Sequence, residues 1–197
     1  SNGGITAGRR SPATALFPYV TEDKLADSPG TTGPVTSLVA TRAGRSSLWH
    51  PPADGDRLVY RSRRRLYKNV LGTRLVFEEE NEDLGLSFRA SWRTSDRFGF
   101  VRECALANTG AGPVAVRLLD GLLDLVPGDA DEWLQRSASC LLDAYKQSER
   151  LPGSPLAVYT LAAQVVDRPE PREALHATAV WSHGLPGARI RLTAEAR

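Results

Sequence analysis

Two runs of alternating side chains, separated by a short turn-forming segment, occupy residues 98–127. In the first run Phe98, Phe100 and Leu106 share one parity, and a period of two places such residues on one face of a β-strand. The segment 108–113 reads NTGAGP, and its glycines and proline favour a turn. The pattern predicts two long strands joined as a hairpin, and apolar residues of both parities predict a place near the middle of a sandwich.

Similar alternation recurs through most of the chain. The clearest amphipathic run is 84–92, in which Leu, Leu, Phe, Ala and Trp alternate with other residues. We expect nine to eleven strands and one short helix at 132–136, which Asp131 and its neighbours would cap. No strand–helix–strand spacing occurs. The sequence therefore predicts an all-β fold, an antiparallel β-sandwich with one short helix.

The segment after the predicted helix is ambiguous between helix and strand. We interpret 140–150 as a strand paired back on 155–166, because a strong turn signal, LPGSP, separates the two. Residues 174–183 and 188–193 are expected to form a last hairpin.

Chain length and composition predict one domain with an added arm. A sandwich of this size is common as a single domain, so residues 35–197 are predicted to form one β-sandwich domain. Residues 1–34 lack a sustained period but contain Leu16 and Phe17, which favours an extended arm packed on the body, with a helical turn at 22–26. The chain contains no Met, which predicts a fragment of a longer protein.

The charge pattern selects no charged partner. The net charge is only +2, and the arginine-rich run 61–65 is split between two faces by strand alternation. A solvated strand face therefore accounts for it better than a nucleic-acid surface, which would need a basic stripe with aromatic residues.

Cysteine content and hydropathy indicate the cellular compartment in which the protein is expected. Cys104 and Cys140 are too few for a disulfide framework or a metal site, and Cys104 is expected to be a buried thiol. No apolar run approaches the roughly 20 residues that a membrane helix needs. We expect a cytoplasmic protein with no membrane partner.

No catalytic motif is recognisable. His50, His176 and His183 are best explained as ordinary surface or core histidines. Asp120 and Asp124 share a strand parity near a strand end, but bonds to neighbouring backbone are the simpler role. Glu103 is expected to pair across the sheet with an arginine. We therefore predict no catalytic residue, no metal and no cofactor.

Tryptophans supply the only candidate binding residues. Aromatic rings can stack on the apolar faces of sugars. Trp92 and Trp181 lie within strand patterns and are expected in the core, whereas Trp49 and Trp133 adjoin turn or helix signals. Trp49 and Trp133 are thus the candidate carbohydrate-binding residues.

Six stretches carry a family resemblance: ALFPYVTEDK at 15–24, GP at 33–34, LW at 48–49, FGFVRE at 98–103, ANT at 107–109 and DGLLDLVP at 120–127. Together they resemble the N-terminal region of large bacterial proteins similar to cellobiose phosphorylase. The resemblance implies a β-supersandwich of the galactose-mutarotase-like type that precedes an (α/α)6 barrel. It further implies that the catalytic acid and the phosphate site lie in that barrel, and that this region supports the fold and the dimer.

Three hypotheses of function follow. The first is a non-catalytic sandwich domain of a carbohydrate-active enzyme, which lends loops to an oligosaccharide site. Its partners would be the C-terminal (α/α)6 barrel of the longer parent chain and a second copy in a homodimer. The second is an autonomous carbohydrate-binding module, which requires Trp49 or Trp133 to be exposed. The third is an aldose-epimerase-type enzyme, which requires His176 or His183 beside a carboxylate in an open pocket.

Overall fold

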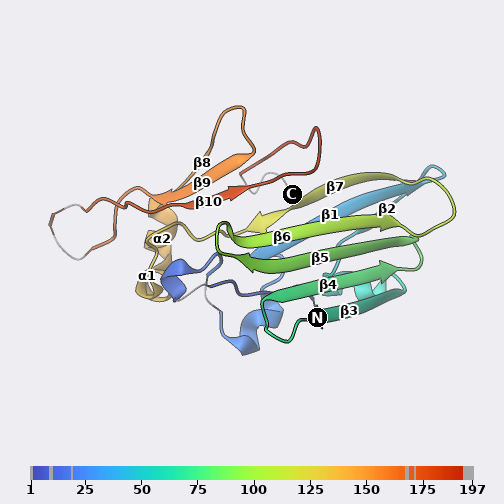
Figure 1. The fold of residues 1–197 in the computed structure, drawn as a ribbon, viewed down its shortest axis with the longest axis horizontal. Coiled ribbons are helices and arrows are strands. Elements are labelled where there is room, and N and C mark those ends of the chain that lie inside the picture. Colours follow the sequence, from blue (N-terminus) through green and yellow to red (C-terminus); the bar gives the residue numbers. More distant parts are fainter. Residues whose placement is uncertain (1, 9–10, 19, 167–168, 171, 193–197) are drawn as a thin grey trace. The chain divides into compact units, whose positions relative to one another are not determined.

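The computed structural model describes residues 2–8, 11–18, 20–166, 169–170 and 172–192 (Figure 1). The chain divides into two compact units. Unit 1 comprises Ser1–Ile5 and Thr21–Leu123, and unit 2 comprises Thr6–Val20 and Asp124–Arg197. The prediction that 35–197 forms a single domain stays a prediction.

The described chain is mostly β-strand. In chain order the strands are β1 (Gly33–Arg42), β2 (Arg45–Trp49), β3 (Ser62–Lys68), β4 (Arg74–Asn81), β5 (Leu86–Ser95), β6 (Gly99–Asn108), β7 (Ala115–Leu123), β8 (Lys146–Arg150), β9 (Leu156–Leu161) and β10 (Thr178–Trp181). The helices are short: η1 (Pro12–Thr14), η2 (Glu22–Asp27), η3 (Asp54–Leu58), α1 (Glu132–Ser137) and α2 (Ser139–Tyr145). All strand pairs are antiparallel, which confirms the all-β prediction.

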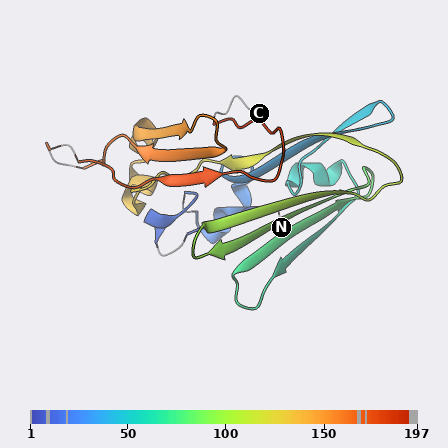
Figure 2. The same ribbon diagram turned by 45° about the horizontal axis from the view of Figure 1, so that its top comes forward.

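Unit 1 is an antiparallel β-sandwich, as predicted. One sheet has the order β2-β1-β7 and the other the order β3-β4-β5-β6, and Figure 2 shows them as separate layers. Their facing side chains form the core: Leu38, Ala40 and Trp49 from the first sheet, and Leu86, Phe88 and Ala90 from the second. The last three belong to the amphipathic run that the sequence placed on the core face.

The predicted hairpin at 98–127 is wrong in its pairing. Both strands exist, but β6 pairs with β5 and β7 pairs with β1, so the connection 109–114 crosses from one sheet to the other. The Arg42 guanidinium holds this crossing by donating to the Gly112 carbonyl at 2.9 Å and to Asn108 Oδ1 at 3.0 Å. Alternation identifies a strand but not its partner, and a six-residue connection can bridge two layers as well as neighbouring strands.

The two strands also lie at the edges of their sheets, and not near the middle as predicted. Cys104 stands opposite the buried Ala90, and Leu118 stands opposite the buried Leu38. Both side chains therefore face the core side, yet both are exposed because β6 and β7 have no further neighbour within the described sheets. The prediction of a buried Cys104 is wrong for this reason.

Unit 2 contains the capped helix that the sequence predicts. The Asp131 carboxylate accepts the Leu134 backbone N–H at 2.8 Å, which satisfies one free donor of the first turn of α1. Leu134 packs with Val126 and Leu142 in the core of this unit.

Two predictions fail in unit 2. The first half of the predicted strand 140–150 is helix α2, from which Leu142 packs into the core. A short apolar pattern fits the period of a helix as well as that of a strand. The second half, β8, pairs with β9 as predicted. The last hairpin is absent: β10 pairs with β9, and residues 188–192 form no strand. Thr193, the last residue of that predicted strand, lies outside the described residues.

Residues of the N-terminal arm pack within both units. In unit 1 the Asn2 side-chain amide donates to the Ala26 carbonyl at 2.7 Å, and η2 confirms the helical turn predicted at 22–26. In unit 2 Phe17 is buried, and the Leu16 carbonyl accepts the Val126 N–H at 3.0 Å. None of the described helices is both long enough and apolar enough to cross a membrane.

Candidate functional sites

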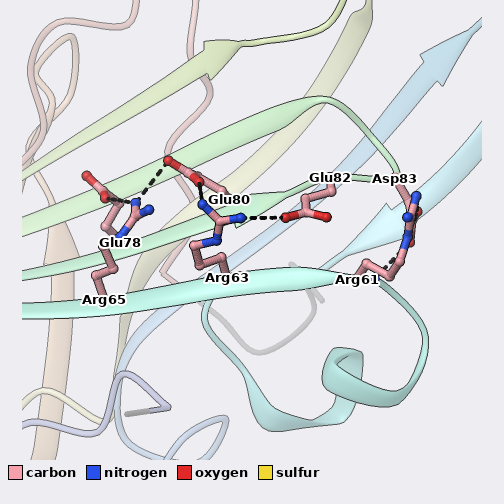
Figure 3. A network of polar contacts seen from close by, with 7 residues as sticks. All are labelled: Arg61, Arg63, Arg65, Glu78, Glu80, Glu82 and Asp83. Atoms are coloured by element: carbon pink, nitrogen blue, oxygen red, sulfur yellow. Dashed lines mark hydrogen bonds and ion pairs between the residues drawn. The ribbon is translucent and has the colours of Figure 1, made fainter.

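The outer face of β3 and β4 carries a ladder of ion pairs, shown in Figure 3. Its shortest nitrogen–oxygen contacts are Arg61–Asp83 at 2.7 Å, Arg63–Glu82 at 3.2 Å, Arg65–Glu78 at 2.9 Å and Arg65–Glu80 at 3.0 Å. The cross-strand register places Arg63 opposite Glu80 and Arg65 opposite Glu78. The arginine-rich run is therefore a charge-balanced strand face, as its alternation predicted.

The inner face of the same strands buries a carboxylate. Glu79 is only 1% exposed, and it accepts the Trp49 indole N–H at 3.0 Å and the Arg64 Nε–H at 2.7 Å. Arg64 also donates to Asp54 Oδ1 at 2.8 Å and to the Ala53 carbonyl at 2.5 Å. A buried charge is tolerated only when it is paired and hydrogen-bonded, and both carboxylate oxygens are occupied here. The cluster joins β2, β3, β4 and η3.

This cluster corrects the prediction for Trp49. The ring is 0% exposed and forms part of the sandwich core, so it presents no face to a sugar. The turn signal of the following prolines suggested exposure, but the partner of the indole N–H, Glu79, lies 30 residues away in sequence and left no local signal.

A second polar cluster lies on the core side of β1, β6 and β7. The Arg102 guanidinium donates to both oxygens of Asp120, at 2.7 and 2.8 Å, and the Thr36 hydroxyl donates to Asp120 Oδ1 at 2.6 Å. This bidentate geometry is the strong form of an ion pair. Asp120 is therefore occupied in joining two sheets.

The Cys104 thiol lies beside this cluster. Desolvation raises its pKa to about 12; Arg102 opposes this shift, while the charge and hydrogen bond of Asp120 add to it. The residue is exposed, but its thiol remains protonated at neutral pH and is a poor nucleophile.

The remaining candidate carboxylates are also paired. Asp124 lies beyond the end of β7, with φ of 55°, and contacts Lys146 Nζ at 3.5 Å, so the expected strand parity with Asp120 is wrong. Glu103 accepts a hydrogen bond from Arg93 at 2.6 Å across the sheet, which confirms the predicted arginine partner.

Exposed tryptophans occur in unit 2. Trp133, on α1, is 55% exposed, and Trp181, at the end of β10, is 48% exposed. The prediction of a core position is confirmed for Trp92 and wrong for Trp181, because β10 is an edge strand of only four residues. Trp181 is thus an exposed ring that sequence reasoning missed; the polar turn that follows it, Ser-His-Gly, is the one local signal.

Two histidines stand beside carboxylates: His50 Nδ1 lies 3.4 Å from Asp56, and His176 approaches Asp129 more closely. His176 Nδ1 lies 2.5 Å from Asp129 Oδ1, and Asp129 Oδ2 accepts the backbone N–H groups of Leu175 and His176 at 3.0 and 3.1 Å. Burial alone would raise the pKa of Asp129, but the bonds from His176 and Leu175 lower it. The close approach requires glycine at 128, where a Cβ would lie 2.5 Å from the His176 backbone. The carboxylate therefore fastens this loop.

Metal ligation has no candidate in the described part of the chain, since no three His, Cys, Asp or Glu residues there are arranged so that they could hold a metal ion. Comparisons with protein-family models and with curated proteins find no match to this chain.

Proposed function

We propose that the chain is a non-catalytic β-sandwich domain of a carbohydrate-active enzyme of the glycoside phosphorylase or hydrolase kind. Its role is to support a neighbouring (α/α)6 barrel and to form a homodimer, with a supersandwich of the galactose-mutarotase-like type as its fold. The proposal rests on the sequence resemblance and on two structural observations.

The first observation is the use made of polar side chains on the core side of the two sheets. Glu79 and Asp120 are each held by an arginine and a second donor, and both tryptophans of unit 1 are buried. Carboxylates that could act on a sugar therefore bond to neighbouring strands, and the rings that could stack against one lie in the core. This is expected of a supporting domain.

The open edge of the sandwich supports the partner part of the proposal. Leu118 and Cys104 face the core side of their sheets but are exposed, and Phe98, next to β6, is 48% exposed. Exposed apolar side chains at sheet edges favour association with further protein, which is the behaviour proposed for the barrel and the dimer.

A second candidate is autonomous carbohydrate binding through unit 2. Trp133 and Trp181 are exposed, as stacking on a pyranose ring requires. An aldose-epimerase-type activity is the third and weaker candidate, and its only structural support is the Asp129–His176 pair.

Sugar titration followed by tryptophan fluorescence separates these candidates. The scaffold proposal expects a flat response to glucose, cellobiose and longer β-glucans, and no acceleration of glucose mutarotation in a polarimeter. A saturable response that is lost in Trp133→Ala or Trp181→Ala, and retained in Trp133→Phe, would establish the binding module instead. Accelerated mutarotation that is lost in His176→Gln would establish the enzyme.

For the compartment we propose the cytoplasm. Cys104 and Cys140 are both free thiols, which suits a reducing environment.

A further inference from the structure

Unit 2 contains an open hollow of about 490 Å³ between the β8–β9 turn and residues 188–191. Three arginines line it: Arg150 from the end of β8, and Arg189 and Arg191 from the segment that follows β10. Gly153 and Ser154 of the turn line the same hollow. The sequence marked Gly153 and Ser154 only as part of the LPGSP turn, and it singled out none of the three arginines.

The β8–β9 turn forms one wall. The Ser154 N–H donates to the Leu151 carbonyl at 3.1 Å, and Gly153 has φ of 70°. A positive φ at this position, after Pro152, is typical of a type II turn and is readily adopted by glycine. The turn follows Arg150 directly, so its geometry holds that arginine at the rim of the hollow.

The segment after β10 forms the other wall. The Ser182 N–H donates to the Pro155 carbonyl at 3.4 Å, which ties the end of β10 to the β8–β9 turn. The Ala188 N–H donates to the Leu185 carbonyl at 3.3 Å. After this turn the chain runs back along the β8–β9 hairpin (Figure 1). Arg189 and Arg191 therefore line the same hollow as Arg150.

The charge of the hollow is unbalanced. Its described lining includes three guanidinium groups and no carboxylate. Within the described residues none of the three arginines has an ion-pair partner, in contrast to Arg61, Arg63 and Arg65 on the outer face of β3. Three like charges around one hollow repel one another, and an anion placed among them removes that repulsion.

We propose that this hollow binds an oxyanion, either free orthophosphate or the phosphate group of a small phosphomonoester. Guanidinium groups donate in a fork that matches phosphate oxygens, and charge-assisted bonds of this kind are the strongest that side chains form. Ser154 adds a hydroxyl, whose oxygen already accepts the Leu156 N–H at 3.2 Å and whose proton can therefore turn to an anion. The volume lies within the range of small-molecule sites. The proposal does not depend on the role in carbohydrate metabolism.

Calorimetric titration of the full chain tests the proposal. The probes are orthophosphate and glycerol 2-phosphate, titrated separately at constant ionic strength maintained with chloride, so that general screening does not change. We expect saturable binding of at least one probe. Arg150→Gln and Arg189→Gln should each weaken it about tenfold, as the loss of one charge-assisted contact predicts. Preference for orthophosphate or for the ester identifies the source of the phosphate group.

Arg45→Gln is the matched control, because Arg45 is an exposed arginine of unit 1 and is not among the residues that line the hollow. It should bind as the wild type does, and circular dichroism should show all variants folded. The proposal is overturned if neither probe binds saturably, if Arg45→Gln weakens binding as much as the hollow variants, or if only a polyanion such as a DNA oligonucleotide binds. The last result would indicate a nucleic-acid surface.

Discussion

Replacing Glu79 by alanine tests whether the sandwich depends on its buried carboxylate. The substitution removes the acceptor of the Trp49 indole N–H and of the Arg64 Nε–H, in a site that is 1% exposed. Breaking a buried ion pair from one side costs about 3–5 kcal/mol, because the remaining groups stay buried without a partner. Arg64 keeps Asp54 at 2.8 Å, which favours the lower end, whereas the stranded indole N–H adds to the cost.

The neighbouring residue supplies the control. Glu80 lies one position along β4 on the outer face, where its side chain is 39% exposed and contacts Arg65 at 3.0 Å. Surface ion pairs contribute only about 0–1 kcal/mol, so Glu80→Ala should be nearly neutral.

Urea and thermal unfolding, followed by far-UV circular dichroism and tryptophan fluorescence, measure both variants. For a chain of this size each kcal/mol lowers Tm by about 2–4 °C, so Glu79→Ala should lower it by about 6–20 °C. If Glu79→Ala is no more destabilising than Glu80→Ala, the buried cluster does not hold the sandwich together and the reasoning is refuted.

Three further predictions concern other parts of the chain. Trp49→Ala should reduce the free energy of unfolding by about 3–5 kcal/mol, whereas Trp133→Ala should change it by less than about 1 kcal/mol, because only Trp49 is buried; equal costs in urea unfolding would contradict this. In a Cys140→Ser background, alkylation of Cys104 by iodoacetamide should keep rising with pH beyond the ordinary thiol range, because its pKa is raised to about 12, and Asp120→Asn should speed the reaction; a plateau near pH 9 would be the wrong result. The pKa of Asp129 is lowered in the folded state, so its stabilising effect is present above the unfolded pKa of about 3.9 and is lost as the pH falls through the folded pKa. The Tm of the wild type should therefore fall more steeply than that of Asp129→Asn below about pH 4, and parallel curves would disprove the linkage.

Local patterns predicted the elements of this fold well where one face is buried. The strict alternation of 84–92 gave the core residues Leu86, Phe88 and Ala90, because a half-buried strand must keep one parity apolar. The Asp131 cap likewise marked the start of α1, since capping depends only on neighbouring residues.

Pairing between distant segments could not be predicted in the same way. β6 and β7 are strands, as their sequences indicate, but the choice of β5 and β1 as partners depends on side chains across the sandwich. α2 shows the converse problem, because a run of seven residues is too short for its period to separate helix from strand.

Among the candidate site residues, too, the prediction was right where exposure depends on neighbouring residues and wrong where it depends on distant ones. Trp133 is exposed on α1 as expected. Trp49 is buried because its ring packs in the sandwich core and its indole N–H bonds to Glu79, which is remote in sequence. The hollow lined by Arg150, Arg189 and Arg191 had no signal in the sequence, since these side chains meet only when the segment after β10 returns to the β8–β9 turn.

The most direct test of the proposed supporting role is a nitrogen-15 indole spectrum of the chain, titrated with cellobiose and longer β-glucans. The four tryptophans report on both units, with Trp49 and Trp92 buried in unit 1 and Trp133 and Trp181 exposed in unit 2. The account predicts that none of the four indole resonances shifts up to millimolar sugar. A saturable shift of the Trp133 or Trp181 resonance would contradict it and make the chain a carbohydrate-binding module in its own right.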